Sequence, residues 1–220
     1  MPGWVTRAGD TDCYIQEASW NCAMACAAMA LNRLGHGHPT TRAIAAASQA
    51  NSGNYIPANS DRAGGQDITQ NSTGLIAALA LRRKAINPDD NPLATSSPGD
   101  MLSRLQTGSD PGTSGKNIAN TLKLQYNVQT AQYKTITAGA VGPLKATMAG
   151  ATVTHPVILG LVNPPHFVLC EGLVHGSSNR YNIVDPADGV RYTDGRLRSG
   201  PTLKFNGQAY NTAVDEVIVT

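Results

Sequence analysis

The hydrophobic pattern of the chain changes near residue 150, and this change constrains the fold more than any other feature of the sequence. Before it, apolar residues recur at helical spacing. After it, short runs rich in β-branched residues, 155–162 and 167–174, are separated by turn sequences such as Gly176–Asn179. Helices followed by antiparallel strands are typical of an α+β protein in which the two kinds of element are segregated.

Start and stop signals delimit the expected elements. The first helix begins at the N-cap candidate Ser19 and ends before Gly35. In a later helix Ile118 and Leu122 are expected to face the core, with Leu124 or Tyr126 as further candidates. The expected helices are 19–34, 43–49, 74–84, 98–106, 114–124 and 137–149. The expected strands are 128–133, 155–162, 167–174, 180–184, 190–192 and 213–219, and long loops are expected at 51–72 and 87–98.

The charge of the chain is low and nearly balanced. Its 220 residues include 17 Lys and Arg against 15 Asp and Glu, which gives a formal net charge of +2. The one basic cluster is Arg82-Arg83-Lys84, so the electrostatic footprint of a nucleic-acid-binding protein is absent and no nucleic-acid partner is expected. A chain of this length needs only one hydrophobic core. We therefore expect a single domain, 1–220, with a helical half at about 14–150 and a sheet half at about 153–220.

Membrane and export signals are not apparent in the sequence. No apolar run approaches the ~18 residues of a membrane-spanning helix, and the first 20 residues lack the basic start and apolar core of a signal peptide. We therefore expect a soluble protein with no membrane partner. It would lie in the cytoplasm or be secreted by a route that does not use such a signal. The oligomeric state is left open.

The four cysteines, Cys13, Cys22, Cys26 and Cys170, have neither the paired spacing of a zinc site nor the density of a disulfide framework. No metal and no cofactor is therefore expected. Cys26 lies one helical turn beyond Cys22 and Cys170 lies in an apolar strand, so both are expected in the core. A disulfide between Cys13 and one of the others is the alternative.

Cys22 differs from the other cysteines because it lies at the start of a helix. With Ser19 as the N-cap, Cys22 is the third helical residue, where free N–H groups and the positive end of the helix dipole favour a thiolate. Cys22 is therefore a candidate nucleophile; the alternative is a small apolar core residue. Gln16, six residues upstream, carries a side-chain NH2 that can join the Cys22 backbone N–H in binding an oxyanion.

A catalytic thiol needs a base, and the chain has five histidines. His166 is distinguished by its context, because it follows the rigid sequence Asn163-Pro164-Pro165 and opens an apolar strand. Its imidazole is therefore expected at the mouth of that strand, with its backbone anchored. The alternative is a histidine that caps a strand edge.

Two blocks of sequence carry a family resemblance. In the first, Gln16 precedes by six positions a cysteine that opens an Ala-rich helix; the second consists of residues 166–172 (HFVLCEG) and 181–186 (YNIVDP). Together they resemble the papain-like cysteine peptidases, nearest to the bacterial bacteriocin-processing peptidase domains and the type III effector cysteine proteases. The 144 residues between Cys22 and His166 fall in the ~130–150 range of papain-like enzymes. The resemblance implies a helical half packed on a C-terminal antiparallel sheet, an active site in the groove between them, and Asp185 as the residue that orients His166.

The pairing of the strands around the turn at 176–179 decides which side chain can orient His166. Simple register leaves Asp185 four residues along from His166, about 13 Å away, and brings Asp188 nearer. A β-bulge, or a turn centred nearer His175, would bring Asp185 opposite His166 instead. The resemblance favours Asp185, and Asp188 and Asn182 are the alternatives.

These residues predict a cysteine peptidase that acts on a protein or peptide. Cys22 would attack the carbonyl carbon of a peptide, isopeptide or amide bond, and His166 would transfer the proton. Trp20 and Asn21, next to the nucleophile, are the substrate-binding candidates. For Trp20 the alternative is packing against the helix, and for Asn21 it is a solvated position at the helix start.

Two other functions fit the same residues. The acyl group can pass to an amine or a thiol instead of water, as in transglutaminase-like proteins. A papain-like fold can also serve as a non-catalytic module that binds a peptide. From the composition and the resemblance to effector proteases, we expect a secreted bacterial effector or toxin.

Overall fold

The computed structural model describes residues 3–6, 11–16, 22–41, 43–44, 115–134, 136, 140–162, 165–198, 202–211 and 217–220. The expected helices 74–84 and 98–106, most of 43–49, and the loops 51–72 and 87–98 lie outside these residues. The helices within the described ranges are α1 (Cys22–Arg33), α6 (Gly115–Gln125) and α7 (Val141–Gly150). The strands are β1 (Gly3–Val5), β2 (Cys13–Ile15), β3 (Gln132–Lys134), β4 (Val157–Val162), β5 (Pro165–Leu173), β6 (Tyr181–Asp185), β7 (Val190–Arg198), β8 (Thr202–Phe205), β9 (Gln208–Asn211) and β10 (Val217–Val219).

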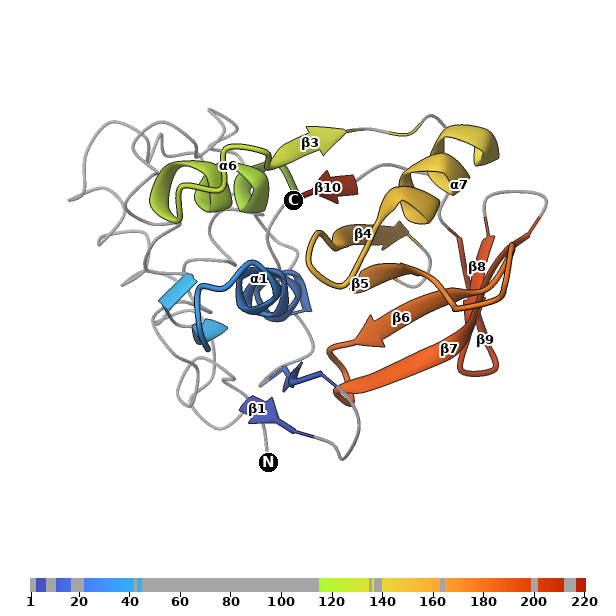
Figure 1. Ribbon diagram of the computed structural model, residues 1–220, viewed down its shortest axis with the longest axis horizontal. Coiled ribbons are helices and arrows are strands. Elements are labelled where there is room, and N and C mark those ends of the chain that lie inside the picture. Colours follow the sequence, from blue (N-terminus) through green and yellow to red (C-terminus); the bar gives the residue numbers. More distant parts are fainter. Residues whose placement is uncertain are drawn as a thin grey trace, which may run out of the picture.

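The large sheet is antiparallel throughout, with the strand order β3-β10-β4-β5-β6-β7-β8-β9. It is curled, and its last strand, β9, returns to contact β4 (Figure 1). The prediction of an α+β fold with an antiparallel C-terminal sheet is confirmed. The strict segregation of helices and strands is wrong, because the β1–β2 hairpin precedes α1. Strand β3 lies between α6 and α7, where the strand 128–133 was expected.

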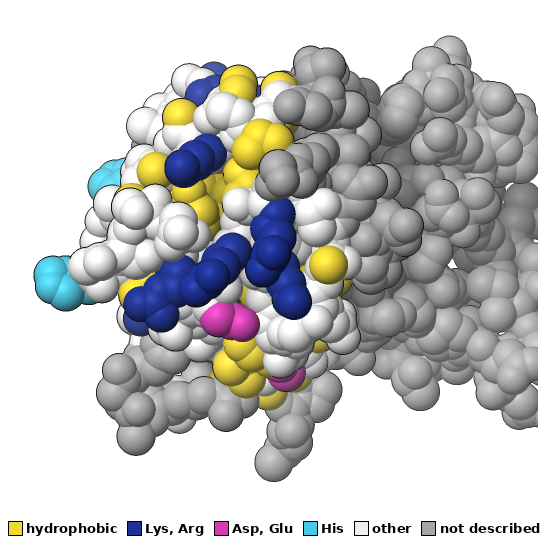
Figure 2. Space-filling view, turned by 90° about the vertical axis from the view of Figure 1, so that its right-hand side faces the viewer, with side chains coloured by type: hydrophobic (Ala, Val, Ile, Leu, Met, Phe, Trp, Pro, Cys, Tyr) yellow, Lys and Arg dark blue, Asp and Glu magenta, His cyan; other side chains and the backbone are white. Residues whose placement is uncertain are grey.

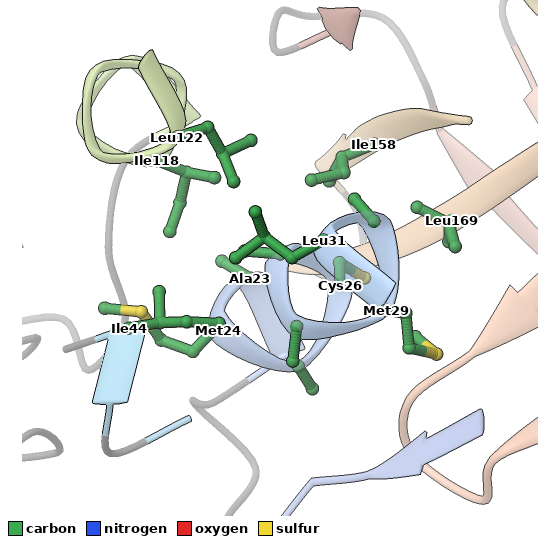
Figure 3. Close-up of a cluster of buried hydrophobic side chains, with 14 of the residues drawn as sticks. Ala23, Met24, Cys26, Met29, Leu31, Ile44, Ile118, Leu122, Ile158 and Leu169 are labelled. Carbon is green, nitrogen blue, oxygen red and sulfur yellow. The ribbon is translucent and has the colours of Figure 1, made fainter. Parts of the chain in front are cut away.

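Helix α1 is the centre of the larger core. Residues 22–31 are all buried, since the small alanine side chains let neighbouring elements approach from every side. Figure 3 shows Ile118 and Leu122 of α6 pointing at α1 from one side and Ile158 and Leu169 of the sheet from the other. The helix ends at Arg33, just before the predicted stop residue Gly35. The φ of Gly35 is +87°, and the Gly35 and His36 N–H groups donate hydrogen bonds back to Asn32 and Leu31.

Helix α7 covers the opposite face of the sheet from α1. Alternate residues of β5 divide between the two cores: Leu169 packs in the α1 cluster, whereas Val168 and Cys170 pack with Leu144 and Met148 of α7. The sheet is therefore covered by a helix on each face. This arrangement leaves the start of β5 at the edge of both cores.

Helix α6 has the predicted inward face. Ile118 and Leu122 are fully buried, and Tyr126, just after the helix, packs on the same cluster. Leu124, the other candidate, is 63% exposed. Among the described residues, none of the helices combines the length and apolar character required to span a bilayer.

The β8–β9 hairpin is absent from the predicted elements. Its two strands pair from Phe205 with Gln208 onward, so they are joined by the two-residue turn Asn206-Gly207. Both turn residues have positive φ, +49° and +71°, as the tight turns of hairpins require. The Asn-Gly sequence between alternating residues was the signal that could have predicted this hairpin.

Candidate active site

Three side chains from separate elements meet where α1 reaches the end of the sheet. Cys22 is the first residue of α1, His166 the second of β5 and Asp185 the last of β6. His166 Nε2 lies 2.7 Å from Asp185 Oδ1, and the Cys22 side chain is close enough to the His166 imidazole to raise its pKa. Because Nε2 is occupied by Asp185, Nδ1 is the ring nitrogen left for the thiol. Thiol, imidazole and carboxylate therefore lie in that order at one place.

A β-bulge brings Asp185 within reach of His166. Strand β5 pairs with β6 at Leu173↔Tyr181 and at Cys170↔Ile183, so three steps along β5 correspond to two along β6. The bulge moves the pairing by one residue, and the turn, which sets Leu173 rather than Val174 opposite Tyr181, moves it by one more. Asp185 therefore lies two residues closer to His166 than simple register would place it.

Gly172 makes the bulge possible. Its φ of +88° is in the left-handed region, and a Cβ at this position would lie 2.1 Å from the backbone oxygen of Ala151. Only glycine fits both the conformation and the close approach. The loop after α7 therefore helps to set the register on which the His166–Asp185 contact depends.

The carboxylate of Asp185 is itself fixed in place. Its Oδ1 also accepts a hydrogen bond of 2.8 Å from the Ala187 backbone N–H, and its backbone oxygen accepts one from Gly189. The two alternative candidates for orienting His166, Asp188 and Asn182, make other contacts. Asp188 accepts hydrogen bonds from the Tyr192 hydroxyl and the Val190 N–H, and the Asn182 amide donates to the Leu173 carbonyl.

The surroundings of His166 favour its charged form. Burial lowers the pKa of this imidazole, but the hydrogen bonds with Asp185 and Cys22, and the charges of the same two groups, outweigh it and raise the pKa from 6.5 to about 9. Burial raises the pKa of the Cys26 and Cys170 thiols and keeps both neutral.

All four cysteines of the chain are free and buried. Cys26 and Cys170 are in the core, as predicted, and the alternative of a Cys13 disulfide is not what the structure shows. Cys22 is 7% exposed and lies at the edge of the core rather than inside it, beside the His166 ring, of which 12% is exposed.

Gln16 lies next to the carboxylate end of the site. Its backbone N–H donates a 2.8 Å hydrogen bond to the carbonyl of Pro186, the residue after Asp185. Its side-chain Oε1 is buried and has no hydrogen-bond partner among the described residues. The structure thus brings Gln16 to the region of Cys22, His166 and Asp185. Ser19, Trp20 and Asn21 lie outside the described residues.

Tyr210 is a site residue that sequence reasoning missed. Its ring stacks on His166, with ring centroids 6.1 Å apart and an interplanar angle of 28°. Phe205 also stacks on Tyr210, at 4.9 Å and 11°, and the Tyr210 hydroxyl donates to Gln208. Both aromatic rings come from the β8–β9 hairpin, so the Asn-Gly turn was also the signal for this contact.

A buried ion-pair cluster holds the other end of α1 to the same strand. Arg33 Nε donates a 2.8 Å hydrogen bond to Glu171 Oε1, and Arg191 of β7 forms an ion pair with Glu171 Oε2 at 2.8 Å that lacks hydrogen-bond geometry. The Arg33 guanidinium also donates to the Asp12 carbonyl and the Thr11 hydroxyl. Helix α1 is therefore fastened at both ends, through Cys22 and through Arg33.

The described parts of the chain contain no group of three or more His, Cys, Asp or Glu side chains that could hold a metal ion. The comparisons with protein-family models, with curated proteins and with solved structures each gave no match. A function for this chain therefore has to be inferred from the geometry of the site itself.

Proposed function

We propose that this protein is a papain-like cysteine peptidase with Cys22 as nucleophile, His166 as acid and base, and Asp185 as the orienting residue. The observation that carries the proposal is the 2.7 Å hydrogen bond between His166 and Asp185 with the Cys22 side chain beside the same imidazole. A free thiol at a helix start, a histidine beside it and a fixed carboxylate behind the histidine are the parts that activate a thiol for acyl transfer.

The reaction follows from the roles of these groups. The Cys22 thiolate attacks the carbonyl carbon of a peptide bond, and the carbonyl oxygen becomes an oxyanion that the Cys22 backbone N–H and the Gln16 side chain stabilise. His166 gives its proton to the leaving amine as the C–N bond breaks, which leaves a thioester on Cys22. His166 then takes a proton from water, and the hydroxide attacks the thioester and releases the acid.

The papain-like arrangement belongs to the same proposal. Helix α1 would deliver Cys22 to one wall of a groove, and the ends of β5 and β6 would deliver His166 and Asp185 to the other. A substrate chain lying between the helical half and the sheet would then present its carbonyl carbon to the thiol. The contact between the start of α1 and His166 supports this placement.

The direct test is incubation of the purified protein with peptides from a digested proteome, with new termini identified by mass spectrometry. Asp185→Asn should slow cleavage by about 10²- to 10⁴-fold, because the imidazole loses its orienting partner. Asp188→Asn is the matched control and should cleave normally, since that carboxylate contacts Tyr192 and Val190. Cleavage in H₂¹⁸O should label the new carboxyl terminus, as hydrolysis requires.

Cys22→Ala and His166→Ala should remove cleavage altogether. A wild-type protein that cuts none of the peptides, or a Cys22→Ala variant that cuts as well as the wild type, would contradict the proposal.

A further inference from the structure

Four basic residues lie side by side on the outer face of the curled sheet, and we name them the basic row: Arg180, Arg196, Arg198 and Lys204. Arg196 pairs directly with Lys204 across β7 and β8, and Arg198 is two residues farther along β7. Arg180 immediately precedes Tyr181, which pairs with Gly195, so Arg180 and Arg196 are neighbours on adjacent strands. The row therefore crosses three neighbouring strands.

The side chains of the row all point to solvent. All four residues are exposed, whereas their sequence neighbours Tyr181, Gly195 and Leu203 are buried on the inner face. Figure 2, which faces the side of the molecule that carries β7 to β9, shows Lys and Arg side chains gathered on this surface. The alternation of strand residues thus sorts these cations onto one face.

Placing these four cations together costs electrostatic energy. The composition does not require it, because the chain carries 15 acidic residues beside its 17 basic ones and could alternate the charges on this face. Like charges directly opposite each other on paired strands destabilise a sheet, and Arg196 and Lys204 are such a pair. None of the four has an ion-pair partner among the described residues. The acid on the same stretch, Asp194, accepts a hydrogen bond from the Asn206 N–H.

We propose that the basic row is a docking surface for an acidic polypeptide segment. The row spans about 10 Å, the width of three strands, which suits two or three carboxylates of one extended segment. Closely spaced acidic side chains on one extended segment match this surface in charge.

A polypeptide fits the surface better than a nucleic acid. Binding to duplex DNA typically neutralises about 6–10 phosphates, and binding to single strands uses exposed aromatic rings for stacking. The row has four cations, and the exposed large hydrophobic residues among the described ones are Leu124 and Leu173, neither of which is aromatic.

The basic row is separate from the site of chemistry. Arg180 lies five residues from Asp185 along β6, about 16 Å away. Docking there does not require Cys22 or His166. The inference consequently goes beyond the proposed peptidase activity, and each can be tested without the other.

The test measures binding to the full chain carrying Cys22→Ala, so that no probe is cleaved. The probe is a fluorescein-labelled peptide of about twelve residues, composed of Asp and Glu. Fluorescence anisotropy should show binding that weakens about tenfold or more when salt is raised from about 50 to about 300 mM. A peptide with Asn and Gln in place of the acids should not bind.

Two double variants with the same change in net charge locate the binding. Arg196→Glu with Lys204→Glu should weaken binding at least about tenfold, whereas Lys123→Glu with Lys134→Glu, which changes exposed cations of α6 and β3, should leave it unchanged. Lys204→Glu alone should also weaken binding while the melting temperature stays equal or rises, because an opposite-charge pair replaces a like-charge pair. Weaker binding together with an unchanged or higher melting temperature cannot result from unfolding.

Three outcomes would overturn the proposal. These are equal loss of binding in the two double variants, equal binding of the Asn/Gln peptide, and tighter binding of a single-stranded RNA oligonucleotide or of anionic phosphatidylserine vesicles than of the acidic peptide. The last would assign the row to a nucleic acid or a membrane surface.

Discussion

The imidazole of His166 is held on three sides. Asp185 accepts a hydrogen bond from Nε2, the Cys22 side chain lies beside the ring, and Tyr210 stacks on its face. These contacts fix both the position of the ring and its charge. The charge has a consequence that can be measured without any substrate, because a pKa that differs between folded and unfolded states makes stability depend on pH.

The pKa of His166 is about 9 in the folded protein, above the value of 6.5 expected when the chain is unfolded. Its protonation therefore stabilises the fold fully below about pH 6.5, and this contribution is lost as the pH rises through about 9. Urea unfolding should show that His166→Gln is less stable than wild type by at most about 3 kcal/mol at pH 6, with the difference shrinking by pH 10. His175→Gln, at an exposed position, is the control and should show no such trend. A difference for His166→Gln that does not vary with pH would contradict the charged imidazole.

Gly172 can be compared with another glycine of nearly the same conformation. Gly172→Ala would place a Cβ 2.1 Å from the Ala151 oxygen at a φ of +88°, whereas Gly176→Ala, at +74°, meets open space. We expect about 1 kcal/mol of destabilisation at Gly176 from backbone strain alone, and at least about 3 kcal/mol at Gly172, where a steric clash is added. Urea unfolding of both variants measures this. Equal destabilisation at the two positions would show that the close approach of Gly172 to Ala151 does not contribute to the loss of stability.

At the scale of elements, the two ends of α1 are tied to one strand. Cys22 contacts His166 at one end, and Arg33 contacts Glu171 at the other. Eleven residues of helix and five of strand separate these contacts, and both spans are about 16 Å. The ion-pair cluster around Glu171 therefore helps to set where α1 lies along β5, and with it the position of the thiol.

Glu171→Gln should destabilise the protein by about 3 kcal/mol, because it leaves the buried Arg33 and the partly buried Arg191 without their counter-charge. Chemical unfolding measures the loss. Asp194→Asn removes an exposed carboxylate from the same sheet and should change stability by less than about 0.5 kcal/mol. A Glu171→Gln protein as stable as wild type would mean that the cluster contributes no net attraction.

Long elements with a clear pattern could be predicted from the sequence, and short ones could not. The spacing of Ile118 and Leu122 predicted α6, and Gly35 predicted the end of α1. Strands β1 and β2 have three residues each, too few to show a period. The bulge at Gly172 depends on the close approach of the Ala151 backbone. Ala151 is far from Gly172 in the sequence, so a local sequence pattern cannot reveal the bulge.

At the scale of the whole molecule, the site exists because distant segments converge. The sequence predicted that Cys22 and His166 would meet and named Asp185 as the orienting residue, and the structure brings the three together. Tyr210 and the Arg33–Glu171 contact were not predicted, because each depends on how the sheet curls and on which helix covers it. Patterns within one element carry no information on such contacts.

The measurement that tests the central claim most directly is the rate of Cys22 alkylation by iodoacetamide at about pH 6, followed by peptide mapping of all four cysteines. If an imidazolium at His166 stabilises a thiolate at Cys22, Cys22 should react at least about tenfold faster than Cys13, Cys26 and Cys170. His166→Ala should abolish that advantage while the protein stays folded. Equally slow alkylation of all four thiols, or a fast reaction at Cys22 that survives His166→Ala, would contradict the account.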